Sequence, residues 1–247
     1  MEIPEYNPAA QLPQNAQVVF VGKRQTGKTF CCNDFLNQIS DRIYDCTVFT
    51  GSNCDVTLPV KGVVKKFEGE LNISAISRAL RIQLKRRRLA VEYNVAPLST
   101  CVWLEDLTHL KPNILETAPF HALECMPKSL NSYCFITVQH PAVLSYKKLS
   151  SSTDVAVFTQ ETNIDTIHSI HSKFAANIDF DRFAAIFEQC TADHKVMVVD
   201  CKCRNDAPAI YWYKAKEAPM KKMEECSMSD RVAEAAEAEE ELEGLIG

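Results

Sequence analysis

Residues 19–30 read VFVGKRQTGKTF, the most informative stretch of the sequence about the fold. Within it, Gly22–Thr29 matches the pattern G-x-x-x-x-G-K-[ST] in full. The apolar run QVVFV precedes the loop, and TFCCNDFLNQI follows it with the apolar spacing of a helix. From average residue usage, a chance match in a chain of this length is on the order of one per cent. Strand, loop and helix together therefore predict a phosphate-binding loop.

The chemistry of this loop follows from its residue types. Two glycines let the backbone wrap closely around an anion, and successive N–H groups point inward at the start of a helix. We expect the ammonium group of Lys28 to neutralise the β- and γ-phosphates of ATP, and the hydroxyl of Thr29 to ligate Mg²⁺. The predicted nucleotide contacts are Gly22, Lys23, Arg24, Gln25, Thr26, Gly27, Lys28, Thr29 and Phe30.

Two acidic residues end another apolar run, in STCVWLEDLTH at 99–109. We expect Glu105 to hold Mg²⁺ together with Thr29, and Asp106 to polarise the attacking water. The alternative interpretation of this pair is a solvated strand end. A further run, YCFITV, ends in Gln139, whose amide is expected to sense the γ-phosphate. The predicted catalytic residues are Lys28, Glu105, Asp106 and Gln139.

Short apolar runs alternate with helical stretches, which predicts an α/β fold. Near-continuous apolar runs are typical of parallel strands that are covered on both faces. We predict a P-loop NTPase with a mostly parallel central sheet, helices on both faces, and an additional strand between the strand of the phosphate loop and the strand that ends in Glu105. The last two runs, at 195–199 and 209–213, predict an antiparallel edge hairpin. Apolar spacing between 164 and 187 predicts two amphipathic helices.

Charge is unevenly distributed along the chain. Residues 217–247 contain ten acidic and three basic residues, which leaves 22 acidic and 24 basic residues before them. The whole-chain net charge of −5 therefore does not exclude a nucleic-acid partner. We divide the chain into an N-terminal extension at 1–16, a single ATPase domain at 17–216 and an acidic tail at 217–247 that is partly disordered or helical.

The expected location is intracellular. No apolar run approaches the roughly 20 residues needed to cross a bilayer, and the first residues lack the pattern of a secretory signal. Several of the eleven cysteines lie inside strand or helix patterns, as reduced thiols do. No metal site is predicted at Cys201 and Cys203, or at His168 and His171, because further ligands at suitable spacing are missing.

The segment ISAISRALRIQLKRRR at 73–88 predicts an amphipathic helix with a strongly basic side. Three interpretations of the basic side stay open: it tracks a DNA phosphate backbone, it is a solvated face, or it is a subunit contact that donates an arginine to a neighbour. The apolar residues are Ile76, Leu80 and Leu84, and the basic ones are Arg78, Arg81 and Lys85–Arg88.

Several motifs in sequence order resemble one family, the genome-packaging ATPases of nucleocytoplasmic large DNA viruses in the FtsK–HerA superfamily. The similarity extends over roughly residues 17–215. The motifs that carry it are VGKRQTGKT, VFTGSN, RIQLKRRR, VWLEDL, FITVQHP, DVAVFTQE, FAAIFEQCTADHKVMVVDC and YWYKA. The phosphate loop is common to many families, whereas this series of motifs in order is much more specific.

The resemblance implies an ATP-driven, Mg²⁺-dependent motor that moves viral double-stranded DNA into a capsid without reading its sequence. It also implies a homo-oligomeric ring, a capsid or viral membrane protein as partner at the packaging vertex, and a location at the viral assembly site or in the virion. Two alternatives remain: a helicase or other nucleic-acid remodelling ATPase, and a nucleotide-binding assembly protein without turnover.

The chain departs from the family pattern at three places. Glu105 and Asp106 stand where members usually have Asp-Asp or Asp-Glu. PKS, with Lys128, replaces a GRH segment, and KKLSSSTD, with Ser150, lacks an expected arginine. Lys128, Lys147 and Lys148 are the candidate replacements for these arginines, although a lysine lacks the bidentate fork of a guanidinium group.

Overall fold

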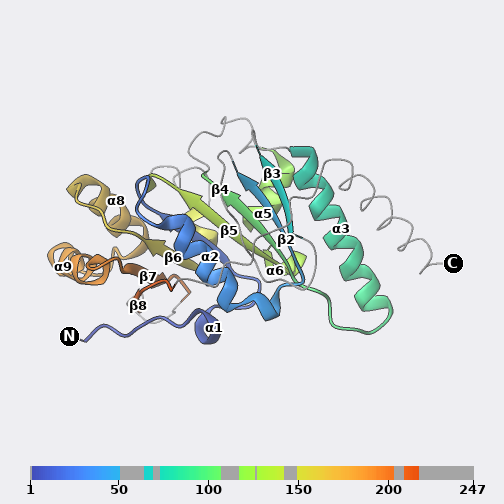
Figure 1. Cartoon of the computed structure of the whole chain (residues 1–247), viewed down its shortest axis with the longest axis horizontal. Coiled ribbons are helices and arrows are strands. Elements are labelled where there is room, and N and C mark those ends of the chain that lie inside the picture. The colour runs from blue at the N-terminus through green and yellow to red at the C-terminus, as the bar shows by residue number, and fades with distance from the viewer. Residues whose placement is uncertain are drawn as a thin grey trace.

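A computed structural model describes residues 2–50, 64–68, 73–106, 117–125, 127–141, 149–202 and 209–216 (Figure 1). Its centre is an eight-stranded sheet in the order β3-β2-β4-β5-β1-β6-β7-β8. Neighbouring strands from β3 to β6 run parallel, whereas β7 runs antiparallel to both β6 and β8. The strands are β1 Gln17–Val21, β2 Asp45–Thr50, β3 Val64–Glu68, β4 Thr100–Glu105, β5 Ser132–Val138, β6 Val155–Phe158, β7 Val196–Asp200 and β8 Ala209–Tyr213.

The sheet confirms the predicted α/β class. Strands β1, β4, β5 and β6 are buried along their whole length, as expected of parallel strands covered on both faces. The antiparallel edge hairpin is β7–β8. The additional strand between β1 and β4 is β5 in space, whereas β2, which comes between them in sequence, lies on the far side of β4. Strand β3, with the sequence VKKFE, was not predicted because two lysines interrupt its apolar pattern.

Helices cover both faces of the sheet, as predicted. One apolar core joins α2 and the residues near α1 to the sheet, and a second core joins α3, α5, α8 and α9 to the opposite face. Figure 1 shows α3 at the end of the sheet that carries β2 and β3, and α8 and α9 at the end that carries β7 and β8. The helices are α1 Pro8–Gln11, α2 Lys28–Gln38, η1 Ser40–Arg42, α3 Ile73–Glu92, α5 Ala118–Cys125, α6 Pro127–Leu130, α7 Leu149–Ser152, α8 Ile164–Phe174 and α9 Phe180–Thr191.

Helix α3 forms where it was predicted, but its buried face differs at one position. Ile76 and Leu80 are buried, whereas Leu84 is 42% exposed and Gln83 takes the inward position. The Nε2 of Gln83 donates hydrogen bonds to the carbonyl oxygens of Leu98 at 2.8 Å and Asn131 at 3.1 Å. A glutamine is buried here because backbone acceptors that precede β4 and β5 need a donor.

The two predicted helices between 164 and 187 are α8 and α9. Both begin at a polar capping residue: Asn163 accepts from two backbone N–H groups of α8, and Asp179 accepts from one of α9. Their apolar faces meet the sheet, except that Ile164 is 53% exposed. His168 stacks on the ring of Phe180, so it serves in packing between the two helices.

The first residues pack along the opposite edge of the sheet from α3. Ile3 and Tyr6 are buried, and the backbone N–H of Tyr6 donates to the carbonyl of Trp212 at 2.8 Å. Cys31, Cys32, Cys46, Cys101, Cys134, Cys190 and Cys201 are free thiols, and all of these except Cys201 are buried. Cys203 lies outside the described residues. In the described part of the chain, no helix is both long and apolar enough to span a membrane.

Candidate nucleotide site

The predicted site residues meet at one edge of the sheet. Parallel pairing places the carboxyl ends of β1, β4, β5 and β6 along this edge, so the loop after β1 faces the residues that follow β4 and β5. Glu105 is the last residue of β4, and Gln139 follows β5. The order β4-β5-β1 therefore brings two polar strand ends beside the phosphate loop.

The backbone of the loop requires glycine at two positions for different reasons. Gly27 has φ of 86° and caps α2, accepting from the N–H of Cys31 at 2.9 Å. At Gly22 the reason is contact: an added Cβ would lie 1.7 Å from Oγ1 of Thr159. The loop thus packs directly against the end of β6, and Gly22 permits this close approach.

Lys28 lies inside the loop. It is 8% exposed, and its Nζ donates to the carbonyl oxygen of Lys23 at 2.6 Å. Burial lowers the pKa of Lys28, and the carboxylates of Asp106 and Glu105 oppose that shift. The first turn of α2 therefore holds a desolvated cation between the loop backbone and two acidic groups.

Glu105 joins the loop to β4 through hydroxyl groups. Oγ1 of Thr29 donates to Oε1 of Glu105 at 2.9 Å, and Oγ1 of Thr50 donates to Oε2 of the same carboxylate. Glu105 is 7% exposed. These three side chains form a cluster of oxygen atoms, and hydroxyl, carboxylate and water oxygens are the ligands that Mg²⁺ prefers.

Sequence reasoning missed Thr50. It ends β2 directly opposite Glu105 in the parallel register. A threonine at the end of the run CTVFT is a weak signal by itself, because only the pairing of β2 with β4 gives it a partner.

Asp106 and Gln139 are in contact with each other. Nε2 of Gln139 donates to Oδ2 of Asp106 at 2.6 Å. The backbone N–H of Asp106 donates to Oγ1 of Thr137 at 2.8 Å, and its φ is 54°. A left-handed backbone is uncommon outside glycine, although aspartate adopts it more often than most residues, and this turn directs the carboxylate toward the end of β5.

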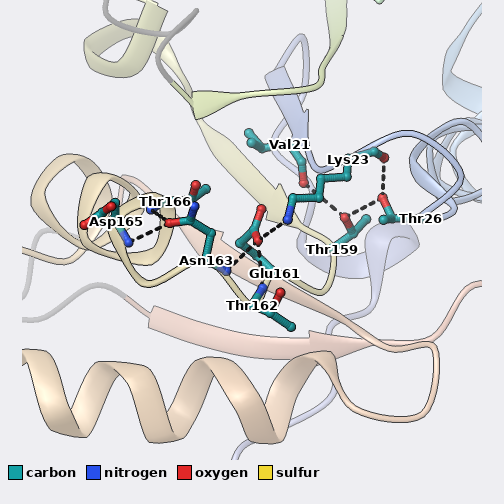
Figure 2. A network of polar contacts seen from close by, with 9 residues as sticks. All are labelled: Val21, Lys23, Thr26, Thr159, Glu161, Thr162, Asn163, Asp165 and Thr166. Carbon is teal, nitrogen blue, oxygen red and sulfur yellow. Dashed lines mark hydrogen bonds and ion pairs between the residues drawn. The ribbon is translucent and has the colours of Figure 1, made fainter.

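A second set of polar contacts ties the loop to the segment after β6 (Figure 2). Nζ of Lys23 lies 2.7 Å from Oε1 of Glu161, whose side chain is 6% exposed. Oγ1 of Thr159 donates to Oγ1 of Thr26 at 2.7 Å, and that hydroxyl donates to the carbonyl of Lys23. The loop is therefore held from β6 as well as from β4.

Glu161 also organises the start of α8. Its Oε1 accepts from the backbone N–H groups of Thr162 and Asn163, both at 2.7 Å, and Asn163 caps the helix. Burial acts to raise the pKa of Glu161, but the Lys23 ammonium and the two backbone N–H groups outweigh burial and lower it. Sequence reasoning missed Glu161 and Thr159, since only the segment DVAVFTQE pointed to this place.

The remaining predicted contacts lie on the outer side of the loop. Arg24 and Gln25 are exposed, and Gln25 has φ of 61°. Phe30, in the first turn of α2, is 46% exposed. The exposed ring of Phe30, which follows Thr29 in the sequence, is an apolar surface that a ligand can contact.

Lys128 lies where the parallel strands begin, at the opposite ends of the strands from the phosphate loop. Its Nζ is 3.3 Å from Oδ1 of Asp154, which precedes β6, and Nζ of Lys202 lies on the same oxygen. Oδ2 of Asp154 accepts from the N–H of Gln17, the first residue of β1. Since β1 is about 13 Å long at roughly 3.3 Å per residue, Lys128 does not reach the loop of its own chain. Lys147 and Lys148 lie outside the described residues.

Comparisons with known proteins bear on the fold. No family model matches the chain, and no curated protein matches its sequence. The genome-packaging NTPase B204 from Sulfolobus turreted icosahedral virus 2, in complex with ATP-gammaS, is similar in structure, with a TM-score of 0.58 and 11% identity. The match covers 86% of this chain and 100% of that one. The chain has the fold of a P-loop NTPase.

Two further solved structures have the same architecture. ATPases 2 and 3 of EssC from Geobacillus thermodenitrificans match with a TM-score of 0.57 and 11% identity, over 84% of this chain and 41% of that one. The pCW3 conjugation coupling protein TcpA, with ATPgS, matches with a TM-score of 0.54 and 11% identity, over 87% of this chain and 70% of that one. At such low identity, these similarities concern the fold.

Proposed function

We propose that this protein is a magnesium-dependent ATPase. The observation that carries the proposal is the hydrogen bond between Thr29 and Glu105, because it joins the phosphate loop to the acidic strand end within one oxygen-lined cluster. Lys28 lies on the loop side of this cluster with a lowered pKa. A cation, two hydroxyls and two carboxylates at the mouth of a phosphate loop suit a polyphosphate with its divalent ion.

Each residue has a distinct task in this proposal. Lys28 exchanges its contact with the carbonyl of Lys23 for the β- and γ-phosphates. Thr29 and Glu105, assisted by Thr50, hold Mg²⁺, which when bound offsets charge on the phosphate oxygens. Most of the rate enhancement in such a site comes from positioning and electrostatics.

Asp106 orients the attacking water and accepts its proton. Its carboxylate is held by the Gln139 amide, and the N–H of Asp106 is held by Thr137, so the acid is fixed from two sides. Gln139 senses the γ-phosphate through its contact with Asp106, because a change in the water or the phosphate alters that hydrogen bond.

The finer proposal is a motor that moves double-stranded viral DNA into a capsid as a homo-oligomeric ring. It is supported by the motif series in the sequence and by structural similarity to a protein described as a genome-packaging NTPase. Its partner at the packaging vertex is a capsid or viral membrane protein. The position of Lys128 supports one alternative, a nucleotide-binding assembly protein without turnover, since this candidate replacement for an arginine binds Asp154 instead.

The test is ATP hydrolysis by the full chain with Mg²⁺, with and without duplex DNA. We expect hydrolysis that duplex DNA stimulates, and a Lys28→Ala change that lowers the rate by about 10²–10³-fold. Lys173→Ala, on α8, is the matched control and should leave the rate unchanged. Unchanged hydrolysis in Lys28→Ala contradicts the proposed site. Nucleotide binding without hydrolysis supports the assembly protein, and separation of a labelled duplex supports a helicase.

A further inference from the structure

The outer surface around the end of α3 exposes large apolar side chains. Eight such side chains are exposed in the described part of the chain, and six of them lie on α3, on the segment after it, or beside it. They are Tyr44 at 39%, Leu84 at 42%, Val91 at 76%, Tyr93 at 60%, Val95 at 60% and Leu98 at 47% exposed. Apolar patches gathered in this way mark binding surfaces.

Three basic side chains lie among these apolar ones. Arg81, Lys85 and Arg88 are exposed at helical spacings of four and three, so they share one face of α3 with Leu84 and Val91. None of the three makes an ion pair with another described residue. We call these three basic side chains, together with Leu84, Val91, Tyr93, Val95 and Leu98, the α3 surface.

The other two arginines of the run Lys85–Arg88 point elsewhere. The guanidinium group of Arg86 lies 2.6 Å from Oδ2 of Asp45, and its central carbon lies 5.6 Å from the centre of the Tyr44 ring. The guanidinium group of Arg87 donates to the carbonyl oxygen of Ser129. Only part of the basic run is therefore available to a partner. This division was invisible in the sequence, where the run KRRR is uniform.

The mixture of side chains distinguishes between the possible partners. A DNA backbone is bound by polar and positively charged surfaces, and exposed leucine, valine and tyrosine contribute little to phosphate contacts. Protein interfaces combine an apolar centre with a charged rim. The α3 surface thus fits an acidic protein segment that also carries apolar residues.

We infer that the acidic tail of the same chain, residues 217–247, docks on the α3 surface. The tail has ten acidic and three basic residues, whereas α3 has six basic residues and one acidic residue. Apolar residues are spaced through the tail at Val232, Leu242, Leu245 and Ile246. The tail therefore has acidic residues to match the positive charge of the α3 surface and apolar residues to match its exposed apolar side chains.

The tail is long enough to reach. The chain before it ends beside α2, where the N–H of Lys216 donates to Oδ2 of Asp34 at 2.8 Å. Figure 1 shows β8 and α3 toward opposite ends of the sheet. Eight strands span about 34 Å at roughly 4.8 Å per spacing, whereas 31 residues extend to roughly 100 Å.

Docking has a consequence for any polyanion that approaches α3. A bound acidic tail neutralises Arg81, Lys85 and Arg88 and covers the apolar side chains of the α3 surface. The tail and a nucleic acid would then compete for this face, and added salt would weaken the charged part of the contact.

The experiment is zero-length carbodiimide cross-linking of the full chain, which joins Lys85 to a nearby carboxylate. Equal amounts of ¹⁴N- and ¹⁵N-labelled protein are mixed, so that mass spectrometry separates links within one chain from links between chains. We expect Lys85 to be linked to residues 230–243 within one chain. Lys173 provides the background yield for an amine on a distant helix.

Two variants test the two components of the contact. Arg81→Glu with Arg88→Glu should lower the Lys85 yield about tenfold, since two attractions become repulsions. Changing Glu240→Lys and Glu241→Lys in that variant should restore much of the yield. Val91→Ser should lower the yield about threefold, whereas Ile164→Ser, the matched exposed residue on α8, should leave it unchanged.

Three results overturn the inference. The first is a cross-link yield at Lys85 that is no higher than that at Lys173, and the second is cross-links between chains only. The third is a Lys85 yield that Arg81→Glu with Arg88→Glu does not change. Links between chains would indicate a second copy as the occupant. Circular dichroism verifies that each variant is folded. Lys28→Ala should retain the link, so failure of the proposed ATPase and failure of the docking are distinguishable.

Discussion

Two buried carboxylates stand at opposite edges of the same sheet. Glu105 ends β4 beside the phosphate loop, and Asp154 precedes β6 at the edge where the parallel strands begin. They are 7% and 2% exposed. The hydroxyl groups of Thr29 and Thr50 donate hydrogen bonds to Glu105. Asp154 instead contacts two lysine ammonium groups and accepts from the N–H of Gln17.

The different partners of Glu105 and Asp154 indicate different roles for the two ends of the parallel strands. A buried carboxylate is costly unless opposite charge and hydrogen bonds compensate it. Lys128 and Lys202 bring that charge to Asp154 from the chain itself. Around Glu105 the hydroxyl donors also have lone pairs that can turn toward a cation, which suits a site that binds a divalent ion.

The largest expected effect is at the phosphate-loop edge. Glu105→Gln keeps the shape of the side chain but removes its charge, so we expect Mg²⁺-dependent hydrolysis to fall about 10²–10³-fold. The melting temperature should stay the same or rise, because a buried charge has been removed. A titration of the rate against Mg²⁺ measures the effect. Full activity in this variant would remove the functional distinction between the two edges.

The effect at the opposite edge should be on stability instead. Asp154→Asn leaves two lysines facing a neutral group, and we expect the unfolding free energy to fall by about 1–3 kcal/mol. This loss is smaller than that for a fully buried ion pair, because both lysines are half exposed. Hydrolysis per folded molecule should not change. Urea unfolding measures the first quantity and a rate assay the second.

Alkaline pH provides a control for this second effect. Burial acts to lower the pKa of Lys202, but Asp154 outweighs burial and raises it. A lysine whose pKa is raised by folding stabilises the protein below its unfolded value near 10.4, and this stabilisation is lost as the pH rises through the higher folded value. The difference in unfolding free energy between wild type and Asp154→Asn should therefore be constant around neutral pH and become smaller in strong alkali. A difference that disappears near pH 7 would contradict the pairing.

The smallest expected effect is at Glu161, which pairs with a lysine as Asp154 does but lies beside the phosphate loop as Glu105 does. Its carboxylate is paired by Lys23, as Asp154 is by lysines, but it lies at the loop. Because Lys23 is 57% exposed, solvent screens the pair, and Glu161→Gln should raise KM for ATP only about two- to fivefold with kcat kept. Glu188→Gln on α9 is the matched control. A lower kcat at unchanged KM would instead place Glu161 in the chemical step.

The parts of the site that sequence predicted are those with a local pattern. Gly22–Thr29 and the acidic pair after β4 stand directly at the ends of apolar runs, and the parallel sheet brings them together. Thr50, Thr159 and Glu161 escaped notice because each acts through a partner that is distant in sequence. Lys128 matched a family offset in sequence, yet it lies at the opposite edge.

The same limit applies to α3. Periodicity predicted the helix, but the placement of Gln83 inside and Leu84 outside depends on backbone acceptors that precede β4 and β5. The division of the basic run into arginines bound by the fold and side chains open to a partner likewise depends on Asp45 and Ser129, which are distant in sequence.

The sequence alone determined the phosphate loop, the alternation of strands and helices, and the uneven charge, because each follows from residues within a few positions of one another. Which carboxylate meets two lysines and which faces the phosphate loop follows from the folded arrangement alone, since strand order sets those neighbours. The residue type sets the chemical properties of a side chain. What that chemistry acts on is set by the groups that folding brings within a few ångströms.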